Sequence, residues 1–532
     1  MLNSTETAYD EVPYPSAIYP QTHPNRLATL ATLFGMKPAP IDRCRVLELG
    51  CGDGSNLIAM AFGLPKSEFV GIDLAKRAIA KGKTIIEQLD LKNISLDQLN
   101  LMQLDSGIGH FDFIIAHGLY SWVPAEARDK ILSICSRHLN DRGVAYLSYN
   151  AYPGNHMRDM VRGMMRYHAA HFRKPEEQVR QARALLSFLA EAKNEPDVYS
   201  AVIGRELERT LKYLDGGFFH DDLSPINFPV YFHEFIEHAS HHGLQYLAEA
   251  DVTDLEILDV KKENFSPKVA ATLAELDSGD VIAREQYLDF LHCRAFRQTL
   301  LCHGGVQLDR IPKPERVWDL FVNADVRPQS QSPDIGSFSA ELFEGPKGAE
   351  IETSRPIVKA ALMRLGMIWP RSASFQELME VIRSQSGYDK DAINADGENG
   401  SQELGNALLR AYAAGFAEFC VHLPGFVTEV SERPMASPLA RLQLQYGNIV
   451  STMRHNTLKI EDNLGRHLVM LLDGTRDRAA LVEDLGKLVR AGAVVVLFEG
   501  KPVRNIQAAM KSLADELEKN LNSLARSAIL VA

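Results

Sequence analysis

Three glycines, Gly50, Gly52 and Gly54, separate a short apolar run from a helix-compatible run. Glycine permits positive φ angles and lets a ligand lie against the backbone. The N-terminus of a following helix also offers free N–H groups to an anion. Asp73 ends the next apolar run about twenty residues later, where a carboxylate can accept hydrogen bonds from both hydroxyls of a ribose. The glycines alone would also fit a tight turn without a ligand, but together with Asp73 they predict a ligand that carries a ribose.

Two residues argue against a dinucleotide as that ligand. Ser55 stands where the dinucleotide fingerprint has its third glycine. Glu48, just before the glycines, places a negative charge where a pyrophosphate would lie. A ligand that carries a ribose and an amino acid suits these acidic residues better.

Strand-like and helix-like runs alternate from about residue 43 to residue 150, and they must position these residues. The predicted strands are residues 45–49, 68–73, 94–99, 111–116 and 143–149. Alternation of this kind predicts an α/β fold with a parallel, doubly wound, Rossmann-like sheet. A helical stretch follows, and two later runs, 244–249 and 297–302, are expected to complete the sheet as its last strands.

The segments "VLELGCGDG", "FVGIDLA" and "FDFIIAHGLYSWVP" resemble the motifs of class I S-adenosylmethionine-dependent methyltransferases. Further segments, among them "SYNAYPG" and "YFHEFIEHASHHGLQYLAEA", resemble bacterial methyltransferases with a regulatory domain, which include rickettsial protein-lysine methyltransferases that modify an outer-membrane protein. This resemblance implies S-adenosyl-L-methionine as cofactor, a helical dimerisation insert, and helix-rich, winged-helix-like C-terminal domains around an open cavity.

The expected domain organisation has six parts. They are an N-terminal lid (1–40), a methyltransferase core (41–155), a helical insertion (156–228), the remaining core and regulatory region (229–308), a middle helix-rich domain (309–434) and a C-terminal winged-helix-like domain (435–532).

The residues expected to bind the cofactor follow from the resemblance and from strand ends. The adenine edge is assigned to the residues after the third strand, although an asparagine stands where the family usually has an acid. The aromatic N-terminal segment is expected to cover the methionine moiety, or alternatively to pack on the sheet as a strap. The full set is Tyr19, Gln21, His23, Glu48, Gly50, Cys51, Gly52, Asp73, Leu74, Asn100, Leu101, His117 and Gly118.

A lysine acceptor must be neutral to attack a methyl group, and its amine needs an orienting hydrogen-bond acceptor. Loops at the carboxyl ends of strands line the crevice of open α/β sheets. Tyr149 and Asn150, at the end of the fifth strand, are therefore the predicted catalytic residues. The predicted substrate contacts are Tyr14 of the N-terminal segment and three residues that could equally cap the sheet, Tyr120, Trp122 and Tyr152.

The composition of the chain limits the kinds of molecule that it is expected to bind. The 532-residue chain has a net charge of −12 and a pI of about 5.8, which argues against nucleic acid and is compatible with a basic substrate. Six scattered cysteines form no CxxC pair, so reduced thiols and a cytoplasmic location are expected. No apolar run is long enough for membrane insertion. The histidines of "HEFIEHASHH" do not have HExxH spacing, so no metal site is expected.

The leading hypothesis is a methyltransferase that acts on lysine side chains of a protein, such as a surface or outer-membrane protein before export. The alternatives are a small-molecule N- or O-methyltransferase and a cofactor-binding scaffold without catalysis. A homodimer through residues 156–213 is expected, because the apolar run "ARALLSFLAEA" lies in an otherwise charged helical segment and because the resemblance implies a dimerisation insert.

Overall fold

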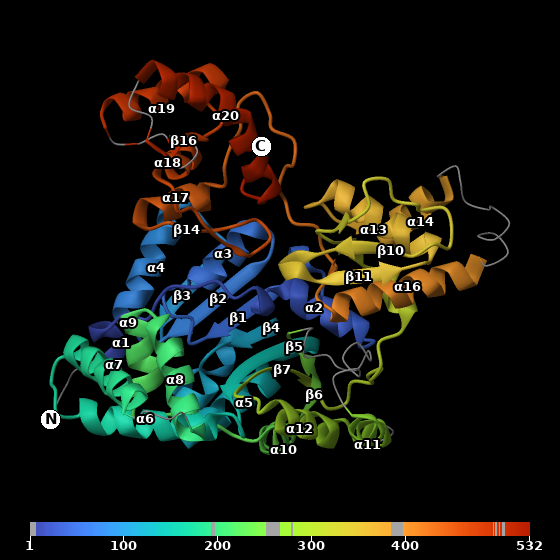
Figure 1. Cartoon of the computed structure of the whole chain (residues 1–532). Coiled ribbons are helices and arrows are strands. Elements are labelled where there is room, and N and C mark those ends of the chain that lie inside the picture. Colours follow the sequence, from blue (N-terminus) through green and yellow to red (C-terminus); the bar gives the residue numbers. More distant parts are fainter. Residues whose placement is uncertain are drawn as a thin grey trace.

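A seven-stranded sheet forms the centre of the computed structural model (Figure 1), which describes residues 7–192, 197–251, 266–277, 280–384, 397–492, 494, 497–498, 501–502 and 506–532. Its strands are β1 (Arg45–Leu49), β2 (Glu68–Asp73), β3 (Ile94–Gln98), β4 (Phe111–Ala116), β5 (Leu139–Asn150), β6 (Leu244–Glu249) and β7 (Phe296–His303). The order across the sheet is β3-β2-β1-β4-β5-β7-β6. Strands β1 to β5 are parallel, and β7 runs antiparallel to both of its neighbours. The predicted doubly wound sheet and its two late strands are confirmed.

Helices cover both faces of the sheet because its strands are apolar on both sides. One face packs against α2 (Pro24–Leu33) and α3 (Ser55–Gly63), with α4 (Lys76–Gln88) beside them. The other face packs against α5 (Ala125–His138) and α10 (Phe232–His241), followed by α11 (Pro267–Asp277) and α12 (Val281–His292). A buried cluster on that side joins Arg297 to Glu249, Glu285 and Asp289 and fixes β6 and β7 to α12.

A helical insertion leaves the core after β5. It consists of α6 (Asn155–Ala169), α7 (Pro175–Glu191), α8 (Val198–Leu211) and α9 (Asp215–Phe218), which share a hydrophobic core of their own. It lies at the lower left of Figure 1, beside the short N-terminal helix α1 (Ala8–Glu11). Its outer surface keeps Phe188, Val198, Leu211 and Leu214 exposed.

A mixed region follows the sheet. Its helices are α13 (Pro356–Ile368), α14 (Phe375–Ser384) and α16 (Gly397–Ala413). Its two small sheets comprise β8 (Phe321–Asn323), β12 (Ala373–Ser374) and β13 (Glu418–Cys420), and β9 (Arg327–Pro328), β10 (Glu341–Glu344) and β11 (Glu350–Thr353). The hydrophobic core of this region is continuous with that of the seven-stranded sheet through α2. The side chain of Asn25, on α2, bonds the backbone of Val421 and His422 just after β13.

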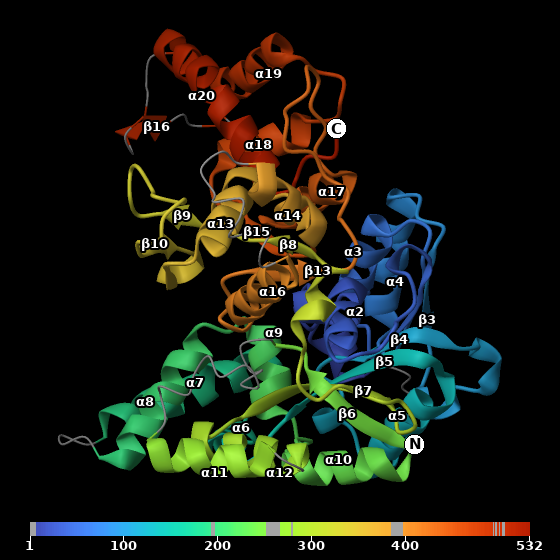
Figure 2. The ribbon, with the colours of Figure 1, turned by 90° about the vertical axis from the view of Figure 1, so that its right-hand side faces the viewer.

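The C-terminal region has a separate hydrophobic core. It contains α17 (Pro438–Tyr446), β14 (Ile449–Ser451), β15 (Thr457–Lys459), α18 (Asn463–Leu471), α19 (Arg478–Arg490), β16 (Leu497–Phe498), β17 (Lys501–Pro502) and α20 (Ile506–Arg526). Figure 2 shows it above the sheet, next to α3 and the middle region. Leu439 of α17 packs against Ile58 and Ala59 of α3, so the C-terminal region reaches the helix that follows the glycines. Among the described helices, none is both long enough and apolar enough to cross a membrane.

Candidate functional site

The glycine-rich turn between β1 and α3 leaves room for a ligand against its backbone. Gly52 has a φ of 57°, and Gly118, in the loop after β4, has a φ of 59°. A Cβ atom built at either position would meet no atom within 4 Å. Both glycines therefore combine a left-handed backbone with open space, as the sequence pattern predicts for a backbone that a ligand approaches.

Asp73 lies at the end of β2, beside this turn. Its carboxylate accepts hydrogen bonds from the backbone N–H groups of Gly52 and Ala75, both at 2.8 Å. Burial raises the pKa of Asp73 above its usual value, but each oxygen keeps lone-pair capacity for a hydroxyl group. The next residue, Leu74, exposes an apolar side chain.

The residues after β3, the strand beside β2, are those expected to contact the edge of the adenine ring. Asn100 follows β3, and its side-chain oxygen accepts a hydrogen bond from Met102 N at 2.9 Å. Met102 is exposed, and Leu101 is half-buried. Leu74 and Met102 are thus exposed apolar side chains at the ends of neighbouring strands, which suits the faces of an adenine ring. The sequence prediction omitted Met102.

Glu48 supplies an unpaired buried carboxylate oxygen at the end of β1. Its side chain is 4% exposed, and Oε1 accepts a hydrogen bond from Asn56 Nδ2 at 2.9 Å. Oε2 is buried, without a hydrogen-bond partner, and burial raises the pKa of Glu48 to about 8. An unsatisfied buried carboxylate oxygen is costly unless a ligand pairs with it. The ammonium of the methionine moiety of S-adenosylmethionine fits this oxygen.

The N-terminal segment passes over the crevice and is held to both of its sides. Ser16 bonds Asp53 of the glycine turn, and Lys81 of α4 pairs with the same carboxylate at 2.7 Å. Tyr14 Oη lies 3.2 Å from Asp221, after α9 of the insertion. The ring of Tyr19 lies over the ring of His117, with centroids 3.8 Å apart. This segment therefore connects the insertion, the glycine turn and the loop after β4.

Four polar side chains meet at the end of the crevice that faces away from β3. The ring nitrogen Nδ1 of His117 lies 2.9 Å from Tyr146 Oη and 3.3 Å from Ser148 Oγ. Tyr146 Oη in turn donates to Gln298 Oε1 at 2.9 Å. Burial lowers the pKa of His117 to about 4, so its imidazole is neutral at physiological pH. This group can position a polar atom without adding charge.

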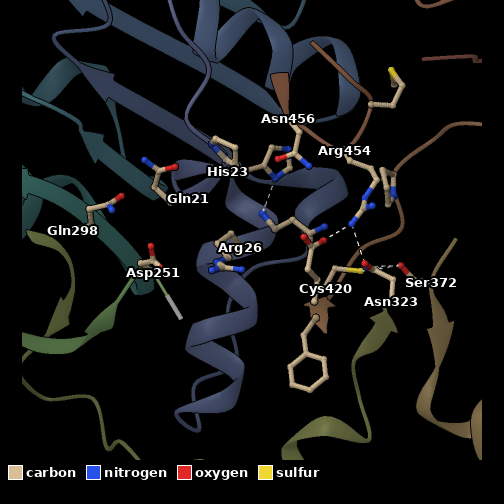
Figure 3. Close-up of a pocket in the computed structure, with 16 residues that line it drawn as sticks. Gln21, His23, Arg26, Asp251, Gln298, Asn323, Ser372, Cys420, Arg454 and Asn456 are labelled. Atoms are coloured by element: carbon tan, nitrogen blue, oxygen red, sulfur yellow. Dashed lines mark hydrogen bonds and ion pairs between the residues drawn. The ribbon is translucent and has the colours of Figure 1, made fainter. Parts of the chain in front are cut away.

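A cavity of about 500 Å³ begins beside this polar group and opens to solvent (Figure 3). Gln21, His23 and Arg26 line it from the N-terminal segment and α2, and Gln298 lines it from β7. Asp251, just after β6, also lines it, and the other walls come from the middle and C-terminal regions, including Asn323, Ser372, Glu418, Cys420, Arg454 and Asn456. Arg454 bonds both Asn323 and Glu418, so the C-terminal and middle regions are joined at the cavity wall.

The expectation that Tyr149 and Asn150 orient the acceptor is corrected by their positions. Side chains alternate along a strand, so Tyr146 and Ser148 point to one face of β5 and Tyr149 points to the other. Tyr149 is 1% exposed, stacks on Phe235 at 4.1 Å and bonds Thr299 at 3.0 Å. Asn150 bonds Asn227 at 2.7 Å. Both side chains are therefore already paired away from the cavity.

The four predicted substrate residues are dispersed. Tyr120 is buried against Phe235 and bonds His238. Trp122 lies under the guanidinium of Arg162, and Tyr152 bonds Asp159. With Tyr14 paired to Asp221, none of the four belongs to the lining of the cavity in the described part of the chain.

Several site residues escaped the sequence analysis. Tyr146 and Ser148 were not predicted because Tyr149, on the opposite face of β5, was chosen instead. The alternation of side chains along a strand is the signal that could have identified them. Gln298 lies in no sequence motif that would single it out. Asn56 lies one residue inside α3, where helical periodicity alone gives no reason to single it out.

Three family models match this chain. They are "Methyltransferase domain" over residues 47–145, "Predicted methyltransferase regulatory domain" over 215–303, and "PKMT, C-terminal winged helix domain" over 432–529.

A related sequence and two solved structures are similar to this chain over nearly its whole length. An uncharacterised protein of Rickettsia prowazekii is 30% identical over 100% of this chain and 96% of its own. PKMT2 from Rickettsia typhi has a solved structure with a TM-score of 0.85 and 26% identity, covering 98% of this chain and all of that one. A second structure of PKMT2, in complex with AdoHcy, has the same TM-score and 27% identity.

The cofactor fold, the matched segments and the full-length relatives agree. The chain belongs to the class I S-adenosylmethionine-dependent methyltransferases that carry a methyltransferase regulatory domain and a PKMT-type C-terminal winged helix.

Proposed function

We propose that this methyltransferase transfers the methyl group to lysine side chains of a protein. The observation that carries the proposal is the open cavity of about 500 Å³ beside Gln21 and Gln298. Its wall combines amides, carboxylates and guanidinium groups from three regions of the chain. A small apolar acceptor would favour a closed, mostly apolar pocket, whereas an open polar cavity suits a polypeptide segment with one side chain inserted.

The site must align a neutral amine with the donor. S-adenosylmethionine, when bound, supplies a methyl group activated by a positively charged sulfur. The chain mainly has to hold the acceptor at near-attack distance. Gln21 and Gln298 line the cavity, and each carries an amide oxygen that can accept a hydrogen bond from an amine. Tyr146 donates to the Gln298 oxygen and fixes the orientation of that side chain.

The protonation state of the acceptor also matters, because lysine has an ordinary pKa of about 10.4. Two histidines at the cavity are neutral, because burial lowers the pKa of His117 to about 4 and that of His23 to about 3. An amine that is desolvated beside these neutral histidines loses its proton more readily than in water. The net charge of −12 attracts basic protein segments over longer distances.

The likeness to PKMT2 and the resemblance to rickettsial enzymes of an outer-membrane protein support a protein acceptor. We extend the proposal to a surface protein that is methylated in the cytoplasm before export.

The test is labelling of a lysate from the native host with methyl-labelled cofactor. One half of the lysate is first treated with an acetylating reagent, which converts lysine amines to amides that cannot attack the methyl donor. The proposal expects labelled protein bands in the untreated half and their loss in the blocked half. Label in low-mass compounds, or protein label that survives blocking, would contradict it. The first outcome would indicate a small-molecule methyltransferase.

A further inference from the structure

We propose that Asp129, His238 and His242 form a binding site for a divalent transition metal such as zinc. One ligand atom from each residue lies within 4.8 Å of the other two. The Nε2 atoms of His238 and His242 lie 3.3 Å and 2.7 Å from the same oxygen, Asp129 Oδ1. Two imidazoles and one carboxylate are donors that suit zinc, nickel, cobalt or iron(II), and not magnesium or calcium.

The elements bring the three side chains together for identifiable reasons. Residues four apart lie on one face of a helix, so His238 and His242 project side by side from the end of α10. The opposite face of α10 is anchored by buried Phe232, Phe235 and Ile236. Asp129 comes from α5, more than a hundred residues earlier in the chain. Spacings within the histidine-rich helix do not reveal a ligand from α5, so no metal was expected here.

The distances are close to those of a metal site. Zinc–nitrogen and zinc–oxygen bonds of about 2.0–2.2 Å place two ligands of a tetrahedral site roughly 3.3 Å apart. The pair of His238 and Asp129 already has this separation, and the pair of His242 and Asp129 must open by roughly 0.6 Å. The side chain of Asp129 is 63% exposed, so a metal can enter from solvent and keep water as a further ligand.

The other ring nitrogen of His238 also has a partner. Tyr120 Oη lies 2.8 Å from His238 Nδ1, and the Tyr120 ring is buried against Phe235. With Nε2 bound to a metal, the neutral imidazole would carry its single proton on Nδ1, which can donate a hydrogen bond to the Tyr120 oxygen. Ligating histidines usually have such a partner for the other ring nitrogen.

The site would connect two matched segments of the family architecture. Asp129 lies in the methyltransferase segment, and both histidines lie in the regulatory segment. A bound metal would therefore fasten α5 to α10. Through Tyr120 it would also fix the loop that contains Gly118, beside the cofactor crevice.

The test is titration of tag-free protein with cobalt(II), followed by visible absorption and calorimetry. We expect one equivalent to bind with a ligand-field band. His242→Ala and Asp129→Asn should each lower the affinity for cobalt at least about tenfold. Tyr120→Phe should lower it about tenfold, because His238 Nδ1 then loses its hydrogen-bond partner. His241→Ala is the matched control, because His241 is exposed on the same helix outside the cluster, and it should bind like wild type.

Circular dichroism and AdoHcy binding establish that each variant is folded. Absence of stoichiometric cobalt binding by wild type would overturn the proposal. Equal loss in His241→Ala and His242→Ala, or unchanged affinity in folded Asp129→Asn, would overturn it as well.

Discussion

His455 Nε2 lies 3.0 Å from Asn56 Oδ1, although 399 residues separate them in the sequence. Asn56 Oδ1 also accepts from Tyr19 N, and Asn56 Nδ2 donates to Glu48 Oε1 and to Thr22 Oγ1. Burial lowers the pKa of His455 well below its usual value, so the neutral ring acts as a hydrogen-bond donor here. The C-terminal region thus touches the residue that orients the buried carboxylate of the cofactor site.

We expect His455→Ala to weaken AdoHcy binding although the side chain does not reach the carboxylate itself. A neutral hydrogen bond contributes about 0.5–1.5 kcal/mol, so the loss should be roughly two- to tenfold by calorimetry. His467→Ala is the control, since His467 is half-buried in the same region and its Nδ1 bonds the backbone oxygen of Asn463 in its own helix. Equal effects of the two variants would remove His455 from the cofactor network.

Cofactor affinity should depend on pH through Glu48. Its pKa of about 8 means that the carboxyl is mostly protonated at pH 7 without ligand, whereas pairing with an ammonium requires the carboxylate. Binding therefore releases a proton, and AdoHcy affinity should rise about fivefold from pH 7 to pH 8 and flatten above that.

Calorimetry in buffers of different ionisation enthalpy measures this proton release directly. Wild type should release nearly one proton per ligand at pH 7, and Glu48→Gln should release none and bind more weakly. Proton release that persists in the variant would assign the ionisation to another group.

Asp73→Ala removes the carboxylate beside Gly52. Hydrogen bonds to a charged group contribute about 1.5–3 kcal/mol, so AdoHcy affinity should fall roughly ten- to hundredfold. Unchanged affinity of the folded variant would show that the ribose lies elsewhere.

Tyr146 and Tyr149 form a matched pair on opposite faces of β5. In single-turnover methyl transfer, Tyr146→Phe should lose about a hundredfold or more in rate, because Gln298 loses its orienting donor. Tyr149→Phe should stay within about threefold of wild type. AdoHcy affinity should change little in both. The reverse pattern would restore Tyr149 as the orienting residue.

The core sheet was predictable because β1, β2 and β4 are short apolar runs with a helix after each, and Asp73 and the glycines occur at strand ends. The choice between Tyr146 and Tyr149 was not predictable, because an error of one residue in the register of a strand exchanges its two faces. The middle sheets escaped prediction because strands such as β9 and β12 have two residues and no periodicity. The contact of His455 with Asn56 depends on domain packing, which local sequence does not encode.

The helical insertion should mediate a homodimer. Phe188 is 68% exposed and Val198 84% exposed, and apolar side chains exposed together commonly mark an interface. Light scattering should give twice the chain mass at micromolar concentration, and Phe188→Asp should shift it to the monomer. Phe338→Asp, at a similarly exposed site in the middle region, is the control. A monomeric wild type would reject this interface.

The central claim is that the methyl group is transferred to the amine nitrogen of a lysine side chain. The most direct measurement is amino-acid analysis of the host protein labelled by this enzyme with deuteriomethyl S-adenosylmethionine. After complete hydrolysis, mass spectrometry should find the label in ε-N-methylated lysine, and the Glu48→Gln enzyme should give much less of it. Label in methylarginine, in a base-labile methyl ester or in no amino acid would contradict the account.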